Sequence, residues 1–163
     1  MKISNNEKFI LKLLLNDPQT KNSTIADKLN ITPQAVGKIR TQLISKGYIK
    51  NQEIILDYKK LGISVHAIAL IKLLPKAQKF KANELHEVLQ PVNAIRSYAL
   101  PETDITHILI YAFKDVAEYD AYFRNLLNKF GDTLEIKHIY VFSSGSIIKS
   151  SPKNLFLDVL EKS

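Results

Sequence analysis

Apolar residues recur at helical spacing three times near the start of the chain. The spacing predicts helices over residues 5–15, 23–29 and from Pro33 to Gly47. Asn5 or Asn6 is the expected cap of the first helix. Thr32 can accept a hydrogen bond from the free backbone N–H groups of the third helix, and Pro33 fits its first position. Gly47 can adopt the left-handed conformation that ends it. The pattern is that of a helix-turn-helix.

The third predicted helix has two different faces. At about 100° per residue, Val36, Ile39 and Leu43 form one apolar seam. The opposite face carries small, polar and mildly basic side chains, namely Gln34, Thr41 and Ser45, with Gly37 and Lys38 at its margins. A helix that enters the major groove of DNA needs such a face. An ordinary amphipathic surface helix has the same pattern, so the helix alone leaves both interpretations open.

A short hairpin is expected after the third helix. Residues 48–50 and 53–56 are its two strands, and Asn51-Gln52 is the turn between them. Such a hairpin, or wing, completes a winged helix-turn-helix domain over residues 1–56. Residues 57–63 form a short connector.

From Val65 onwards, strand-like and helical patterns alternate. The predicted order is strand, helix, strand, strand, helix, strand, over residues 65–74, 82–90, 94–100, 105–113, 115–130 and 133–142, and a last helix opens at Ser151-Pro152. This order is the ferredoxin-like βαββαβ arrangement: a four-stranded antiparallel sheet, in the order fourth, first, third, second, with two helices on one face. We therefore predict an α+β protein whose second domain spans residues 64–163 and carries an extra C-terminal helix.

Several of the predicted strands are apolar on both faces, although two helices cover only one face of a sheet. Ile68, Leu70, Leu109, Tyr111 and Val141, or their alternates, then need a further layer to pack against. A second copy of the same sheet is the simplest source of that layer, so we predict a homodimer through this domain. The alternative is that the wing domain or the C-terminal helix covers this face.

The net charge of +7 is concentrated in the first part of the chain. Residues 1–62 carry 11 lysines and arginines against 5 acidic residues, whereas residues 63–163 carry 12 against 11. A basic first domain on a nearly neutral second one indicates that the first domain meets a polyanion. The chain has no cysteine, which excludes disulfides and thiolate zinc sites. No signal-peptide pattern and no apolar run of ~18 residues is present, so we expect a cytoplasmic protein without a membrane partner.

The whole arrangement resembles the Lrp/AsnC family of transcription regulators, named for the leucine-responsive regulatory protein. The matching features are the segment TIADKLNITPQAVGKIRTQLISKGYI, the connector ILDYKKLGI and the βαββαβ second domain. The resemblance implies that the third helix enters the major groove of double-stranded DNA. It also implies a sequence-specific regulator whose second domain forms a dimer or a higher oligomer. Two copies related by a dimer axis should read inverted half-sites.

Candidate DNA contacts follow from side-chain chemistry. Phosphate contacts are expected from the cations Lys38, Arg40, Lys46 and Lys50, and base contacts from Gln34, Thr41 and Gln42. An exposed lysine is also commonly just a solvated charge. The family usually has an arginine pair or similar basic residues in the middle of this helix, where the present sequence reads Lys38-Ile39-Arg40.

The resemblance gives one candidate for effector binding. Members that bind amino acids typically carry a glycine, and shortly afterwards an aspartate, between the second and third strands. This chain has LPETDIT over residues 100–106, without a glycine, so only Asp104 is carried over. Since backbone approaches a ligand closely at glycine, amino-acid sensing does not follow from the resemblance, and the small-molecule effector is left open.

Other interpretations use different residues. His66, His107 and His138 lie on neighbouring predicted strands and would form a metal site only if they shared a face, but isolated strand histidines are more often packing residues. Haem-pathway decarboxylases share this architecture, and their candidates here would be Arg96, Tyr98 and His107, although their histidine-asparagine-tyrosine run is missing. We predict no cofactor and no enzymatic activity. A third interpretation is an interaction protein that keeps the helix-turn-helix only as a scaffold.

Overall fold

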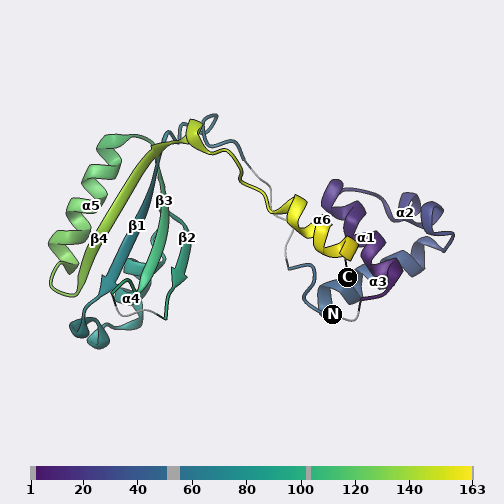
Figure 1. Cartoon of the computed structure of the whole chain (residues 1–163), viewed down its shortest axis with the longest axis horizontal. Helices are drawn as coiled ribbons and strands as arrows, with labels where there is room; N and C mark the ends of the chain where they lie inside the picture. The colour runs from purple at the N-terminus through teal and green to yellow at the C-terminus, as the bar shows by residue number, and fades with distance from the viewer. Residues whose placement is uncertain (1–2, 51–55, 102–103, 163) are drawn as a thin grey trace. The chain divides into compact units, whose positions relative to one another are not determined.

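The computed structural model describes residues 3–50, 56–101 and 104–162, which fold as two compact units. The helical unit comprises Met1–Ile55 together with Lys149–Ser163, and the sheet unit comprises Leu56–Ile148. Figure 1 shows the elements of each unit. In the described part of the chain, no helix has the length and apolar character needed to cross a membrane.

Three helices open the helical unit: α1 over Asn5–Asn16, α2 over Asn22–Leu29 and α3 over Pro33–Ser45. The cap of α1 is Ser4, not Asn5 or Asn6 as predicted. Its hydroxyl accepts a hydrogen bond from the backbone N–H of Glu7, and the Glu7 carboxylate accepts one from the backbone N–H of Ser4. This reciprocal capping box satisfies two donors at once, which a single asparagine would not do.

The predicted boundaries of α3 are confirmed. The hydroxyl of Thr32 accepts a hydrogen bond from the backbone N–H of Ala35, with 3.1 Å between the two atoms, and Pro33 is the first residue of the helix. Asn30 ends α2 in the left-handed conformation, with φ of 53°, and Gly47 follows α3 with φ of 74°. The turn of the predicted wing and most of its second strand lie outside the described residues.

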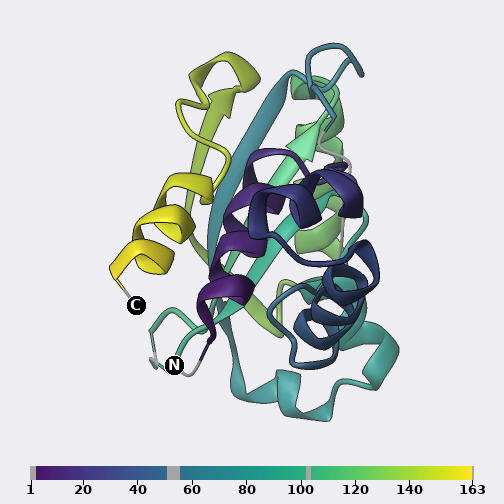
Figure 2. The ribbon, with the colours of Figure 1, turned by 90° about the vertical axis from the view of Figure 1, so that its right-hand side faces the viewer.

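The C-terminal helix α6, over Lys153–Lys162, packs in the helical unit beside α1 (Figures 1 and 2). Leu160 is buried in the same apolar cluster as Ile10 and Leu14. Lys12 of α1 forms an ion pair with Glu161 at 3.6 Å. The sequence-based boundary at residue 64 assigns this helix to the second domain, whereas the structure groups it with the first. An amphipathic helix must bury its apolar stripe, but its sequence does not indicate against which partner.

The sheet unit has four strands: β1 over Val65–Leu73, β2 over Ala94–Ala99, β3 over His107–Phe113 and β4 over Leu134–Ser143. Their order across the sheet is β2-β3-β1-β4, and all neighbouring pairs are antiparallel. The predicted ferredoxin-like topology is therefore confirmed. Two short 3₁₀ helices that the sequence analysis did not predict, over Pro75–Lys79 and Ser144–Ser146, follow β1 and β4.

Helices α4 and α5, over Ala82–Leu89 and Val116–Phe130, cover one face of the sheet. They bury alternate strand residues in a single core. Members of this core are Val65, Ala67, Ala69 and Ile71 of β1, Leu109, Tyr111 and Phe113 of β3, Leu134 of β4, Val88 of α4, and Phe123, Leu126 and Phe130 of α5. Asp115 caps α5, because its carboxylate accepts a hydrogen bond from the backbone N–H of Glu118 at 2.8 Å.

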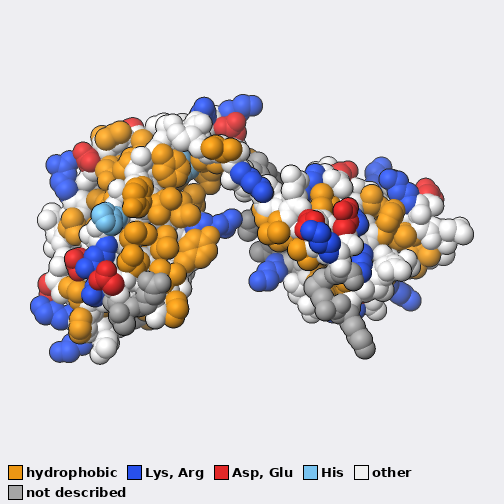
Figure 3. Space-filling view, in the orientation of Figure 1, with side chains coloured by type: hydrophobic (Ala, Val, Ile, Leu, Met, Phe, Trp, Pro, Cys, Tyr) orange, Lys and Arg blue, Asp and Glu red, His pale blue; other side chains and the backbone are white. Residues whose placement is uncertain are grey.

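The opposite face of the sheet, here called the open face, has neither α4 nor α5 on it. Because directly paired strand residues share a face, the pairing places there Ile68 and Leu70 of β1, Ile108 and Ile110 of β3, Arg96 and Tyr98 of β2, and His138 and Tyr140 of β4. Tyr98 and Tyr140 are 48% and 56% exposed. Figure 3 shows hydrophobic side chains gathered over the sheet. The expectation that Leu109 and Tyr111 need an additional layer is wrong, because both are already buried under the helices.

Candidate nucleic-acid interface

Helix α3 presents its polar face to solvent. Its buried side chains are Val36 and Leu43. Counting about 100° per residue from Val36, four side chains fall about 140–200° away and therefore on the opposite side. These four are exposed: Gln34, Lys38, Thr41 and Ser45. The exposed positions agree with a helix that is packed on one side and free to contact a ligand on the other.

Gln42, Lys46 and Lys50 lie near this face but are not equivalent. Gln42 is exposed at the edge of the polar face, and Lys50 is exposed beyond the end of α3. The ammonium of Lys46 pairs with the Glu7 carboxylate at 2.7 Å. The hydrogen bond from Lys46, together with those from Ser4, lowers the pKa of Glu7 to about 2. Lys46 therefore ties the end of α3 to the start of α1.

Arg40 lies on the packed side of α3. Its Nη1 donates to the side-chain oxygen of Asn22 at 2.8 Å and to the backbone oxygen of Thr20 at 3.3 Å. A sequence signal for this position exists, because at 100° per residue Arg40 falls about 40° from Val36, inside the apolar seam. The expected phosphate contact of Arg40 followed from its charge alone, without regard to this angle.

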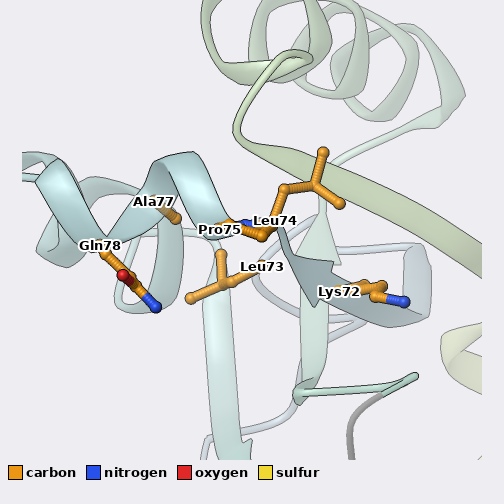
Figure 4. Close-up of a pocket in the computed structure, with 6 residues that line it drawn as sticks. All are labelled: Lys72, Leu73, Leu74, Pro75, Ala77 and Gln78. Atoms are coloured by element: carbon orange, nitrogen blue, oxygen red, sulfur yellow. The ribbon is translucent and has the colours of Figure 1, made fainter.

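Asp104 is engaged by two lysines at one end of the sheet. Its carboxylate is 3.3 Å from the ammonium of Lys72 and 3.2 Å from that of Lys137. These contacts, Lys137 first and then Lys72, lower the pKa of Asp104. Lys72 also lines a cavity of about 360 Å³ just after β1, whose other lining residues are Leu73, Leu74, Pro75, Ala77 and Gln78 (Figure 4).

The three candidate metal-binding histidines do not meet. His66 and His138 share the open face, but their register on β1 and β4 separates them by four strand positions, about 13 Å. His107 pairs with Ile71, whose side chain is in the helix-covered core, so it lies on the other face. Arg96 and Tyr98 likewise share the open face and do not meet His107. Within the described residues there is no cluster of histidine and acidic side chains that would hold a metal ion.

His66 is buried among residues from the first and the last segments of the sheet unit. Its ring lies edge-on to Tyr58 of the connector, with centroids 4.8 Å apart, and is stacked on Phe142 of β4 at 5.6 Å. Its Nε2 is 3.0 Å from the hydroxyl oxygen of Ser144, and that hydroxyl donates to the backbone oxygen of Ile63. Burial lowers the pKa of His66 below its ordinary value.

This environment predicts a pH-dependent stability of the sheet unit. The folded state disfavours the charged imidazole, so unfolding takes up a proton as the pH falls below about 6.5, the ordinary pKa of histidine. We expect the free energy of unfolding to decrease between pH 7.5 and 5.5, measured by urea denaturation. H66F should remove part of this decrease, while H86Q, a change at an exposed histidine of α4, should retain it. An unchanged pH dependence in H66F would contradict the prediction.

Comparison with known proteins supports the interpretation of α3 as part of a DNA-binding helix-turn-helix. A family model described as winged helix-turn-helix DNA-binding matches residues 4–50. The chain is 34% identical to the transcriptional regulator AzlB of Bacillus subtilis over 87 residues, about half of each protein (53% and 53%). It is 33% identical to the HTH-type transcriptional regulator LrpA of Pyrococcus horikoshii over 102 residues, which are 63% of this chain and 70% of LrpA. The structure of AsnC from E. coli superposes with a TM-score of 0.71 at 15% identity, covering 92% of this chain and 95% of AsnC.

A helix-turn-helix with an exposed polar helix face, in a chain whose relatives are named transcriptional regulators, defines a DNA-binding transcription regulator. The sequence identity to LrpA and the two-domain fold shared with AsnC identify the family of this regulator. The chain belongs to the Lrp/AsnC family of transcription regulators.

Proposed function

We propose that the chain binds inverted half-sites in double-stranded DNA as a homodimer, with α3 in the major groove. The observation that carries this proposal is the exposed polar face of α3, opposite a buried apolar seam. Gln34 can pair with an adenine edge, Thr41 can reach a thymine methyl group, and Lys38 can neutralise a phosphate. As a regulator of this kind it would act in the cytoplasm, where it meets chromosomal DNA.

The open face of the sheet supports the dimer. It carries exposed or half-buried apolar side chains on all four strands, a composition that is costly to leave in water. A second copy related by a two-fold axis presents the same surface, so each sheet would cover the other. Two helix-turn-helix units related by that axis would then read half-sites about 34–36 Å apart, or a multiple of that distance.

Selection from a random-sequence duplex library tests the proposal. The selected duplexes should contain two inverted copies of one motif whose centres are about one helical turn apart, or a multiple of it. The selection is repeated with a mixture of amino acids to detect an effector. Enrichment of no motif would overturn the proposed function, and enrichment of a single unpaired motif would overturn the dimeric arrangement.

Lys38 provides a sharper test of the interface. It is exposed and makes neither a hydrogen bond nor an ion pair with any residue that the structure describes. If it contacts a phosphate in each half-site, K38Q should reduce the slope of log K against log salt by about 0.9 per protomer, hence about 1.8 for a dimer. Fluorescence anisotropy on the selected duplex at several salt concentrations measures this slope. An unchanged slope would remove Lys38 from the phosphate contacts.

Asp104 has less support as an effector-binding residue. Its carboxylate already interacts with two ammonium groups, so a ligand amine would have to displace Lys72 or Lys137. Both lysines and Asp104 are partly or fully exposed, so such an exchange costs only the modest energy of surface ion pairs. The amino-acid arm of the selection decides whether an effector acts on this chain.

A further inference from the structure

We propose that Arg40 and Asn22 form a brace that sets the orientation of α3 on α2, and that Arg40 acts as a positioning residue for DNA reading and not as a phosphate contact. The proposal rests on the DNA-binding role proposed for α3. It concerns how the polar face of that helix is held, a role that side-chain charge alone does not indicate.

The first element of the brace is the hydrogen bonding of Arg40. A single guanidinium nitrogen donates to Asn22, the first residue of α2, and to the backbone oxygen of Thr20 in the turn before it. Hydrogen bonds that involve a charged group are stronger than neutral ones. One side chain of α3 therefore holds both the start of α2 and the preceding turn.

The second element is the close approach between the two helices at Gly37. A Cβ atom at this position would lie 3.4 Å from the side-chain nitrogen of Asn22. Gly37 precedes Arg40 by three residues, so both positions lie on neighbouring turns of α3. The Asn22 side chain thus lies beside the α3 backbone at Gly37 and is hydrogen-bonded to the guanidinium of Arg40.

The third element is that, among the side chains that the structure describes, only that of Arg40 is hydrogen-bonded to the start of α2. The cap residue Lys21 makes no side-chain hydrogen bond to the helix, and α2 has only eight residues. The buried residues of α2, Ile25 and Ala26, are its fourth and fifth residues, and none of the first three is buried. The contacts of Asn22 and Thr20 with Arg40 therefore hold the unburied first residues of α2.

Base reading depends on this orientation. The side chains of Gln34 and Thr41 must reach base edges with hydrogen-bond geometry, whereas phosphate contacts tolerate a looser fit. Loss of the brace should therefore weaken specific binding more than nonspecific binding. Loss of a phosphate contact would weaken both and would reduce the salt dependence.

The test compares R40Q, R40K and N22A with K38Q in the full-length chain. If Arg40 and Asn22 form the brace, R40Q and N22A should each reduce affinity for the selected duplex about 10-fold. Their affinity for an unrelated duplex should change less than 2-fold, and their salt slope should equal that of the wild type. R40K should also lose specific affinity, because its ammonium keeps the charge but lies one atom nearer to the backbone. The double variant R40Q/N22A should lose no more than either single variant, since the two residues act as one unit. K38Q should lower the salt slope instead.

A measurement on the protein without DNA tests this proposal independently of the proposed function. Hydrogen exchange should show faster exchange over residues 20–29 in R40K and N22A, but not in K38Q. A salt slope that falls by about 1.8 in R40Q, with R40K close to the wild type, would identify Arg40 as a phosphate contact and overturn the brace. Unchanged exchange over residues 20–29 would overturn it as well, even if the wild type selects no DNA sequence.

Discussion

I110K is expected to convert the proposed dimer into a monomer and to lower affinity for a two-half-site duplex by about 100-fold or more. Ile110 lies in the middle of the open face, paired with Ile68 of β1 and Arg96 of β2. A lysine there would place an unpaired charge at the centre of the proposed interface, which is strongly unfavourable. Separate monomers would lose the effective concentration that links two DNA-binding units, an effect of about 10²–10⁴ in affinity.

Analytical ultracentrifugation and anisotropy on the same samples measure both consequences. L127K is the matched control, because it also replaces an apolar side chain with lysine but on the exposed side of α5, where Leu127 is 46% exposed. Y140K tests the same face at a side chain that is already 56% exposed, so its effect on monomer stability should be small. If I110K and Y140K both sediment as the wild type does, the open face is not the dimer interface.

L160A is expected to destabilise the helical unit by about 2–4 kcal/mol. Leu160 is 7% exposed and belongs to the apolar cluster formed by α1, α2 and α3. Truncating a buried leucine removes its transfer energy and leaves a cavity, which together cost about 2–5 kcal/mol in well-packed cores. The expected value lies in the lower part of that range because α6 is at the edge of the cluster.

Residue-resolved hydrogen exchange of α1 and α3 amides in urea measures this change without mixing it with unfolding of the sheet unit. L155A provides the control in the same helix, because Leu155 is 57% exposed and its truncation should change stability by no more than about 0.5 kcal/mol. Equal effects of L160A and L155A would mean that α6 does not contribute to the core of the helical unit.

The elements of the fold were predictable because their signals are local. Thr32 and Pro33 mark the start of α3, Asn30 and Gly47 adopt the positive φ that their positions require, and Asp115 caps α5. The switch from helical to alternating apolar spacing at Val65 marked the start of the first strand, β1. Each of these signals depends on a few consecutive residues, so sequence alone carries it.

The contacts that the prediction missed are between residues distant in the sequence. Arg40 reaches Asn22 across 18 positions, Lys46 reaches Glu7 across 39, and Asp104, in the loop before β3, pairs with lysines of β1 and β4. A charged side chain carries the same local signal whether it faces DNA or a neighbouring helix. The choice of face on the strands failed for Leu109 and Tyr111 for a related reason: both faces are apolar, so alternation does not distinguish them.

The return of α6 to the helical unit has a consequence for synthesis of the protein. The core that supports α3 includes Leu160, which emerges from the ribosome only after the whole sheet unit has been made. Domains generally fold as units during translation. Here the sheet unit can fold first, whereas the DNA-binding unit cannot complete its core until the last helix is synthesised. A nascent chain arrested before α6 would therefore carry a folded sheet unit and an incomplete DNA reader, so that fragments would compete poorly for operator DNA.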